Sequence, residues 1–263
     1  MPDRGGYTGK KAFFSRVLTV YGRKPALEAL QNPRLACHAL HLADSNRDAG
    51  IISQLKALAT ERDIPVRVHS RIELSRISRN GKQDQGVALD IVCPTFRPVE
   101  EHLQSLHNMA PQRLLALDGI SNPQNLGMIV RSATAGQIDG IIWSRKGNAA
   151  LGPLVIKASA GTLYRAPLLL CTDLPETLQK YRERGVDICA LSAGAALSLF
   201  EHNPAGHSIY ILGNETAGVS ARARETASTA LSIPMGNGVE SLNVAVTASL
   251  IAYAHSLRDY LDR

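Results

Sequence analysis

Apolar and polar residues alternate along positions 17–92 with two different periods. Short apolar runs predict strands, and apolar residues at helical spacing predict helices. In one of the predicted helices, Ile51, Ile52, Leu55 and Leu58 form an apolar stripe, which is typical of a helix that faces a core. Strands that alternate with helices in this way indicate an α/β module. The predicted strands are 17–21, 37–43, 64–69 and 86–92, and the predicted helices are 24–31, 47–62 and 71–79.

A proline-containing segment separates this module from the rest of the chain. Residues 94–112 carry Pro94, Pro98 and Pro111 around a short polar helix, so we interpret them as a linker. The predicted divisions are a basic flexible tail at 1–16, a first domain at 17–93, the linker at 94–112 and a second domain at 113–263. The strands predicted in the second domain are 114–117, 138–143, 163–170, 186–191, 208–212 and 229–233, and its helices include 174–184.

The end of the chain combines a strand, a glycine loop and a helix. Pro234 stops the strand at 229–233, because proline has no N–H for a sheet. Gly236 and Gly238 then permit a tight backbone path, and Ser241 is placed to cap the final helix. Such an arrangement can cradle a ligand, although many α/β proteins share it without binding anything there. The predicted apolar face of the final helix consists of Leu242, Val246, Leu250, Tyr253 and Leu257.

The charge balance points to an anionic partner. Lysine and arginine number 29 against 23 aspartates and glutamates, which gives a net charge of +6. A basic surplus favours a polyanion, and RNA, DNA and an acidic membrane all satisfy it. A mildly basic enzyme with an ordinary solvated surface satisfies it as well. The chain has one Trp, four Phe and seven Tyr, which provide little material for stacking on bases.

The cysteines and the apolar runs exclude several classes of protein. Cys37, Cys93, Cys171 and Cys189 form no CxxC pair, so no metal site is predicted. No apolar run approaches the roughly 18 residues of a membrane span. The N-terminus lacks the apolar core of a signal peptide. We therefore expect a cytoplasmic protein that contacts no membrane.

One capped helix in the second domain has spacing that suits a ligand site. Asn122 is a good N-cap and Pro123 a good first helical residue. Gly127 and Arg131 are four residues apart on this helix, so they share a face that the glycine leaves open. A core helix with a surface arginine has the same spacing.

Charged residues lie in several loops between the predicted strands and helices. Glu215 lies between two glycines after strand 208–212, where a solvated turn residue is equally typical. The remaining candidates could contact RNA phosphate or could simply be solvated. These candidate RNA-binding cations are Arg145, Lys146, Arg222 and Arg224.

Together, three sequence segments of the second domain resemble the three ordered motifs of the SpoU/TrmH family, the 2′-O-ribose RNA methyltransferases of the SPOUT superfamily. Asp118–Gly127 with Arg131 resembles the first motif, although Asn122 and Gln124 replace its common Asp and His. Residues 213–219 resemble the second motif, Leu-Gly-x-Glu-x-x-Gly. The run Ile-Pro-Met at 233–235 and Ser-Leu-Asn-Val at 241–244 resemble the third.

The first domain carries a weaker resemblance. Val20-Tyr21-Gly22 and the Ala-Leu-Glu-Ala-Leu run at 26–30 resemble the opening of the substrate-binding domain that precedes many SpoU methyltransferase domains. Gln85-Gly86-Val87 resembles its closing His-Gln-Gly-Val, with Asp84 in place of the His. The resemblance implies a small α/β domain, similar to a ribosomal protein, that grips RNA.

The resemblance also implies a fold and a chemistry. The second domain is expected to be a parallel sheet with a trefoil knot, to bind S-adenosylmethionine and to form homodimers. The reaction is methylation of a ribose 2′-hydroxyl in structured RNA, with ribosomal RNA favoured over transfer RNA. The implied catalytic residues are Arg131, Asn125, Glu215, Ser241 and Asn243, and the implied cofactor-binding residues are Gly213, Ile233, Met235 and Leu242.

Two other functions stay open at this point. One is an RNA-binding protein on the same scaffold without catalysis. The presence of the polar residues expected at the site argues against it, namely Asn125, Arg131, Glu215 and Asn243. The other is a Rossmann-type oxidoreductase, but Gly236-Asn237-Gly238 lacks the third glycine of that motif. A dimer through the final helix would use its small face, although packing within one subunit requires the same residues. That face consists of Ala245, Ala248, Ser249 and Ala252.

Overall fold

The computed structural model describes residues 13–136 and 138–261, so most of the predicted basic tail at 1–16 lies outside the described residues. The chain divides into two compact units. The first extends to Pro94 and includes Leu151–Pro153, and the second comprises Thr95–Ala150 and the chain from Leu154 onward. The described residues contain no helix with the length and hydropathy that a membrane crossing requires.

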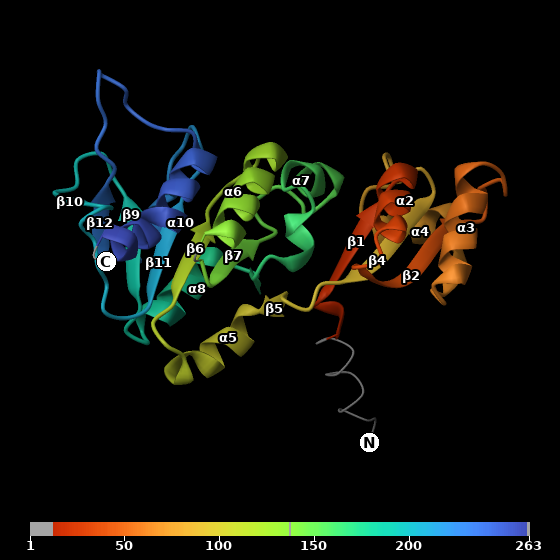
Figure 1. Cartoon of the computed structure of the whole chain (residues 1–263), viewed down its shortest axis with the longest axis horizontal. Coiled ribbons are helices and arrows are strands. Elements are labelled where there is room, and N and C mark those ends of the chain that lie inside the picture. The colour runs from red at the N-terminus through yellow and green to blue at the C-terminus, as the bar shows by residue number, and fades with distance from the viewer. Residues whose placement is uncertain (1–12, 137, 262–263) are drawn as a thin grey trace. The chain divides into compact units, whose positions relative to one another are not determined.

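The first unit is a four-stranded sheet in the order β1-β4-β2-β3 (Figure 1). Strand β4 runs antiparallel to both β1 and β2, whereas β2 and β3 are parallel. Each predicted strand and helix is present within a few residues of its predicted bounds. The strands are β1 (Val17–Tyr21), β2 (Ala36–Ala43), β3 (Val66–His69) and β4 (Val87–Val92), and the helices are α2 (Arg23–Gln31), α3 (Ile51–Glu61) and α4 (Arg71–Ser78).

The second unit is built on an eight-stranded sheet in the order β10-β12-β9-β11-β6-β7-β8-β5. Every neighbouring pair in this sheet is parallel, so both faces need helical cover. The strands are β5 (Arg97–Pro98), β6 (Arg113–Leu117), β7 (Gly140–Ser144), β8 (Leu168–Cys171), β9 (Asp187–Leu191), β10 (Leu197–Ser198), β11 (Ser208–Leu212) and β12 (Thr229–Ser232). The helices are α5 (Val99–Ser105), α6 (Pro123–Ala135), α7 (Pro153–Ala158), α8 (Leu174–Arg182), α9 (Ala221–Arg224) and α10 (Val244–Leu261), with 3-10 turns η1 (Leu106–Asn108) and η2 (Thr162–Arg165).

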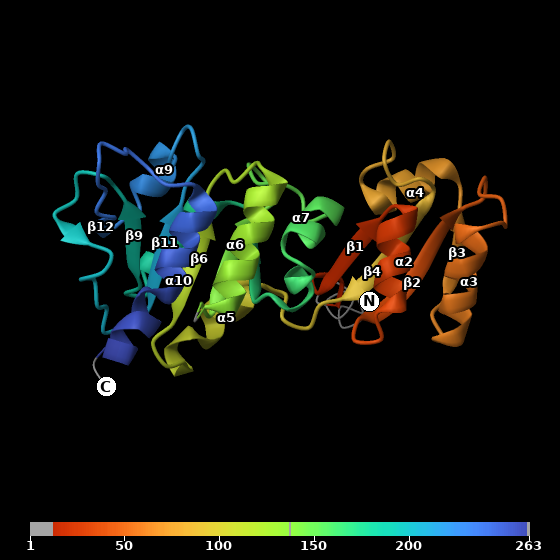
Figure 2. The same ribbon diagram turned by 45° about the horizontal axis from the view of Figure 1, so that its top comes forward.

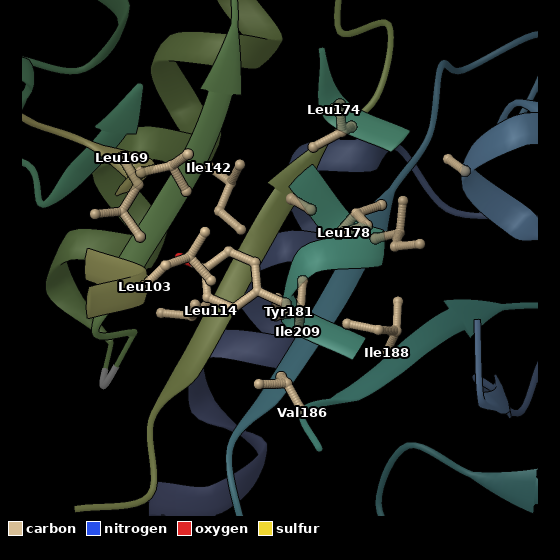
Figure 3. Packing of buried hydrophobic residues seen from close by; sticks show 14 of the residues in the cluster. Leu103, Leu114, Ile142, Leu169, Leu174, Leu178, Tyr181, Val186, Ile188 and Ile209 are labelled. Atoms are coloured by element: carbon tan, nitrogen blue, oxygen red, sulfur yellow. The ribbon is translucent and has the colours of Figure 1, made fainter. Parts of the chain in front are cut away.

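Different helices cover the two faces of this sheet. On one face α8 packs against β7 and β9, and α5 packs against β8 and β5. Leu178 and Tyr181 of α8 are wholly buried near isoleucines of β9 and β11 (Figure 3). On the other face α6 and α10 lie side by side (Figures 1 and 2). Ser249 of α10 donates its hydroxyl to that of Ser132 on α6 over 2.8 Å. A Cβ at Gly136, the C-cap of α6, would lie 2.7 Å from that of Ala252, so the two helices meet through small residues.

The segment predicted as a linker folds as part of the second unit. Residues 95–112 contain β5, which pairs with β8, and the helices α5 and η1. Val99, Leu103 and Leu106 are buried in the core that contains α8. Their apolar side chains stabilise the second unit, whereas a linker would leave such residues solvated.

The strand predicted at 163–170 is shorter in the structure. The 3-10 turn η2 occupies its first part, and β8 covers only Leu168–Cys171. The short elements β10 and α9 were not predicted, because four residues or fewer give no readable period.

The final helix begins two residues later than its predicted cap requires. Asn243, and not Ser241, accepts the N–H of Ala245 over 2.8 Å, so Asn243 caps α10. The predicted apolar face is mostly exposed: Val246 and Leu257 have exposed fractions of 48% and 57%. Buried instead are the small and apolar residues Ala245, Ala248, Ile251, Ala252 and Ala254.

Candidate active site at the carboxyl edge of the sheet

The order of the strands in the sheet indicates where the candidate site lies. The chain passes from β6 to its neighbour β7, but it passes from β11 in the opposite direction along the strand order, to β12. Register pairs Leu117 at the end of β6 with Leu212 of β11 and with Trp143 of β7, so three loops leave the sheet together. The crevice beyond such a divergence point is where open parallel sheets bind ligands.

The loop after β6 leads into a well-capped helix. The side chain of Asn122 accepts the N–H groups of Gln124 and Asn125 at 2.8 and 3.4 Å, and Pro123 follows as the first helical residue. Both features agree with the prediction from sequence. They bring Asn125 into the first turn of α6, where only 8% of the residue is exposed.

The loop after β11 is folded tightly back on itself. Asn214 and Gly218 form an isolated antiparallel bridge, and the Asn214 side chain accepts the N–H groups of Thr216 and Ala217. A Cβ at Gly213 would lie 2.3 Å from the carbonyl carbon of Gly218, so only glycine fits there. This fold presents Glu215 at the exposed tip of the loop.

The three motifs meet at Asn125. Its side-chain amide donates to Oε1 of Glu215 in a very short contact, and its side-chain oxygen accepts from Nδ2 of Asn243 over 3.3 Å. Residues from the loops after β6, β11 and β12 thereby form one hydrogen-bonded chain. Ser241 is exposed two residues before Asn243, and no hydrogen bond of its side chain is recorded within the described residues.

Arg131 is exposed on α6, but the reason predicted for its accessibility is wrong. A Cβ at Gly127 would lie 2.4 Å from that of Ala158 and 2.8 Å from the carbonyl oxygen of Val155. Helix α7 therefore fills the space that the glycine was expected to leave for a ligand. Arg131 lies on the same exposed strip of α6 as Met128, which is 41% exposed.

The loop after β12 is exposed throughout residues 234–243. Its turn has positive φ at Asn237 and Gly238, which confirms the expected tight path. Met235 and Leu242 present apolar side chains to solvent, and Ile233 is half-buried. The four predicted cofactor-binding residues thus lie in the loops after β11 and β12.

The predicted RNA-binding cations lie on α9 and in the loop after β7, at the same edge of the sheet. Arg222 on α9 forms an ion pair with Asp173 at 3.4 Å, and Arg224 donates to the carbonyl oxygen of Val219. Arg145 and Lys146 are exposed in the loop after β7. The backbone N–H of Glu176 and the charges of Arg222 and Lys146 lower the pKa of Asp173, so this edge keeps an ionised acid among its cations.

Two asparagines that sequence reasoning missed hold the loops in place. Asn148 donates to the carbonyl oxygen of Leu117 over 2.9 Å and accepts the N–H of Ile120 over 2.7 Å. Asn214 donates to the carbonyl oxygen of Gly119 over 2.9 Å. Asparagine beside a turn is a general signal for such bracing, and it was available at both positions, since Asn148 follows the turn at 145–147 and Asn214 precedes the turn at 215–217.

Comparison with known proteins assigns the family. Residues 112–253 match the model of the SpoU rRNA methylase family, and residues 19–95 match a domain described as RNA 2′-O ribose methyltransferase substrate binding. The chain belongs to the SpoU family of RNA methyltransferases. An uncharacterized tRNA/rRNA methyltransferase of Mycolicibacterium smegmatis is 32% identical over 233 residues, which are 88% of this chain and 74% of the relative.

Solved structures share the fold. An RNA methyltransferase of the TrmH family from Porphyromonas gingivalis superimposes with a TM-score of 0.60 at 24% identity, covering 96% of this chain and 92% of the other. An rRNA methyltransferase from Sinorhizobium meliloti with bound AdoMet gives 0.62 at 21% identity, covering 93% and 88%. These structures confirm an α/β fold with a parallel sheet.

SpoU methyltransferases use S-adenosylmethionine, and the exposed loops of this chain fit such a ligand. Among the described residues, and apart from the chain neighbours of each glycine, no atom lies within 4 Å of where a Cβ would stand at Gly194, Gly236 or Gly238. The backbones of the loops after β9 and β12 are therefore open, and these two strands are neighbours. Open N–H and C=O groups can bind the polar edge of an adenine, and the apolar side chains of Met235 and Leu242 can cover its face.

Proposed function

We propose that this protein transfers the methyl group of S-adenosylmethionine to a ribose 2′-hydroxyl of structured RNA, with ribosomal RNA favoured over transfer RNA. The observation that carries the proposal is the hydrogen-bonded chain from Asn243 through Asn125 to Glu215, which joins all three motifs at the divergence point of the sheet. The match of the first unit to a 2′-O ribose methyltransferase substrate-binding domain supports the ribose as the target.

S-adenosylmethionine, when bound, supplies an electrophilic methyl group. The protein must then place the ribose and stabilise an oxygen that becomes negative as its proton leaves. Arg131 is the candidate for that stabilisation, since a guanidinium remains charged and cannot act as a base at neutral pH. Asn125, Glu215, Ser241 and Asn243 position the ribose and the arginine, and the loops at Gly213 and Ile233–Leu242 hold the cofactor.

The first unit, with the predicted boundary at 17–93, supplies the grip on RNA. RNA binding by phosphate contacts should weaken steeply as salt rises. Arg145, Lys146, Arg222 and Arg224 would extend that grip to the methyltransferase domain. The pairing of Arg222 with Asp173 limits its contribution unless RNA phosphate displaces the carboxylate.

Three finer features of the family belong to the same proposal. The chain would return from β12 to α10 through a trefoil knot, a topology too rare for periodicity to predict. Two copies would associate through the exposed apolar strip of α10, because its small face is already packed on α6. A cytoplasmic location stays a prediction from sequence.

The alternative is an RNA-binding protein on the same scaffold without catalysis. A methyl-transfer assay separates the two: RNA extracted from cells that lack the gene should accept methyl groups in vitro, and RNA from cells that contain it should not. Mapping 2′-O-methyl groups in both RNAs then identifies the nucleotide. Methylation of a base, or no transfer to either RNA, would overturn the proposal.

Calorimetry with S-adenosylmethionine tests the cofactor separately. Binding should persist in the presence of a chelator, because no predicted role in the transfer requires a metal. Loss of binding on chelation would contradict this part of the proposal.

A further inference from the structure

Three potential metal ligands converge at the amino edge of the second sheet. Asp187 begins β9, Cys189 follows two residues later on the same face, and His202 belongs to the segment between β10 and β11. The distance from Nε2 of His202 to Oδ2 of Asp187 is 3.1 Å, and that from Sγ of Cys189 to the same oxygen is 3.4 Å. The remaining distance, from Sγ to Nε2, is 3.9 Å.

Surrounding groups aim these atoms at one another. Ser228 and Thr229 donate to the other carboxylate oxygen of Asp187 at 2.6 and 2.7 Å, which leaves Oδ2 to face the thiol and the imidazole. The second ring nitrogen of His202 lies 3.2 Å from the hydroxyl of Tyr210. Hydrogen-bond partners of this kind orient the ligands of metal sites in proteins.

We propose that Asp187, Cys189 and His202 form a binding site for a divalent zinc-like cation. A tetrahedral ion with bonds of about 2.0 to 2.3 Å holds its ligand atoms about 3.4 to 3.6 Å apart. The three observed separations, 3.1, 3.4 and 3.9 Å, bracket that range. A mixed set of sulfur, nitrogen and oxygen donors selects zinc or cobalt over magnesium or calcium.

A fourth ligand position would be taken by water. Three protein ligands and one water are a common zinc arrangement. Ser208 pairs in register with Asp187 on the neighbouring strand, and its hydroxyl is buried on the same face of the sheet. A metal-bound water on this face would lie near that hydroxyl. The side chain of Asp187 is 27% exposed, so an ion can reach the site from solvent.

Binding displaces one proton. A cysteine thiol has an ordinary pKa of about 8.5, so a metal-free cysteine carries its hydrogen at neutral pH. Coordination forms a metal–thiolate bond and passes that proton to the buffer. His202 binds as neutral imidazole through Nε2, with its remaining N–H directed at the Tyr210 hydroxyl.

The site is separate from the candidate active site. Asp187 lies at the start of β9, whereas the three motifs lie beyond the ends of parallel strands at the opposite edge. A bound ion would fasten the segment that contains His202 to β9 and stabilise the second unit. It has no part in methyl transfer. Sequence spacing could not indicate it, because the residues are not arranged as a CxxC pair.

Cobalt titration of the full-length, chelator-treated protein tests the site, since a cobalt–thiolate bond absorbs in the near ultraviolet. We expect one equivalent of Co²⁺ to bind with this band, zinc to displace it, and zinc to raise the unfolding temperature. Cys189→Ser should abolish the band, and Cys93→Ser, which alters a buried cysteine of the first unit, should retain it.

A second variant distinguishes the loss of a metal ligand from a folding defect. His202→Gln keeps Cys189, and its circular dichroism should match the wild type, while cobalt affinity falls at least tenfold, the usual effect of losing one ligand or its partner. Absence of stoichiometric binding by the wild type would overturn the proposal. So would a thiolate band that persists in Cys189→Ser.

Discussion

Asn125 donates its side-chain amide to Glu215, although the two residues are 90 positions apart in the chain. The first is buried at the start of α6, and the second lies at the exposed tip of the loop after β11. Their contact spans the point where the chain leaves neighbouring strands in opposite directions. A buried amide is thus fixed against an exposed carboxylate at the place where a substrate can reach it.

The first prediction is that this pair acts as a unit. Asn125→Ala and Glu215→Ala should each slow single-turnover methyl transfer about 10- to 100-fold, the effect of losing one hydrogen bond to a charged group. The double variant should be little worse than either single one, because the second substitution removes an interaction already lost. The free enzyme's affinity for S-adenosylmethionine should change little.

Gln179 and Glu183 provide the matched control. They form another amide–carboxylate pair, with a separation of 3.2 Å, on the exposed surface of α8. Gln179→Ala should leave transfer unchanged. Fully additive losses from Asn125→Ala and Glu215→Ala would show that the pair has no common role.

The second prediction concerns the close approach of α6 to α7. Gly127→Ala would place a Cβ 2.4 Å from that of Ala158 and 2.8 Å from a backbone oxygen, so the helices must separate. Overpacking of this kind costs about 1–3 kcal/mol. The urea midpoint, followed by the fluorescence of Trp143 in β7, should fall accordingly, since the chain contains one Trp.

Gly206→Ala is the control, because no atom of the described part of the chain, apart from the neighbours of Gly206 in sequence, lies within 4 Å of a Cβ at that position. Its midpoint should match that of the wild type. An unchanged urea midpoint for Gly127→Ala would contradict the prediction, because α6 and α7 would then have room for the added Cβ.

The third prediction concerns where the chain can be divided. A fragment that begins at Thr95 should fold and bind S-adenosylmethionine but methylate RNA poorly, because it lacks the RNA-binding unit. A fragment that begins near 110 would lose Val99, Leu103 and Leu106 from the core. Burying each such side chain contributes about 1.5–3 kcal/mol, so the shorter fragment should unfold at lower urea.

Methylation at full rate by the fragment from Thr95 would place the RNA grip in the second unit instead. In that outcome, the salt dependence of RNA affinity should be the same with and without the first unit.

Local signals explain how much of the fold could be predicted. The cap at Asn122 and Pro123 started a helix in the predicted place, because N-cap chemistry acts within three residues. Short buried strands were also predicted correctly, because a run of apolar residues is likewise a local signal. Ser241 failed as a cap because Asn243 offers the same chemistry two residues on, and only the fold decides between them.

Errors arose where a property depends on a neighbour distant in sequence. Helical spacing indicated an apolar face through Val246 and Leu257, but α10 buries its alanines, because α6 approaches too closely for larger side chains. Gly127 was interpreted as an opening, yet α7 fills it. Periodicity locates a face of a helix, and it cannot state what covers that face.

The fourth prediction follows from that exposed face. Val246, Tyr253 and Leu257 are 48%, 42% and 57% exposed along one side of α10. If two copies associate there, sedimentation should give a mass near twice 28.3 kDa. Val246→Asp should shift it toward the monomer, since burying an unpaired charge at an interface is costly.

Ile72→Asp is the control for added charge, because Ile72 is a 67% exposed apolar residue of the first unit. Its mass should stay that of the dimer. A wild-type protein that sediments as a monomer at micromolar concentration would rule out this association.

The last prediction separates catalysis from binding at Arg131. This side chain is exposed on α6, and no hydrogen bond or ion pair of its guanidinium is recorded within the described residues. If it stabilises the developing 2′-oxyanion, its interaction strengthens in the transition state, so its loss affects the chemical step. Arg131→Ala should bind S-adenosylmethionine nearly normally while single-turnover transfer falls about 100- to 1,000-fold.

Two further variants make the role of Arg131 specific. Arg131→Lys should restore only part of the rate, because an ammonium lacks the planar fork that can hold a ribose oxygen and a phosphate together. Arg182→Ala removes an exposed arginine from α8, on the other face of the sheet, and should leave the rate unchanged. Near-normal transfer by Arg131→Ala would falsify the assignment. The charge at the 2′-oxygen would then have to be stabilised by other groups, with Asn243 and Glu215 as the next candidates.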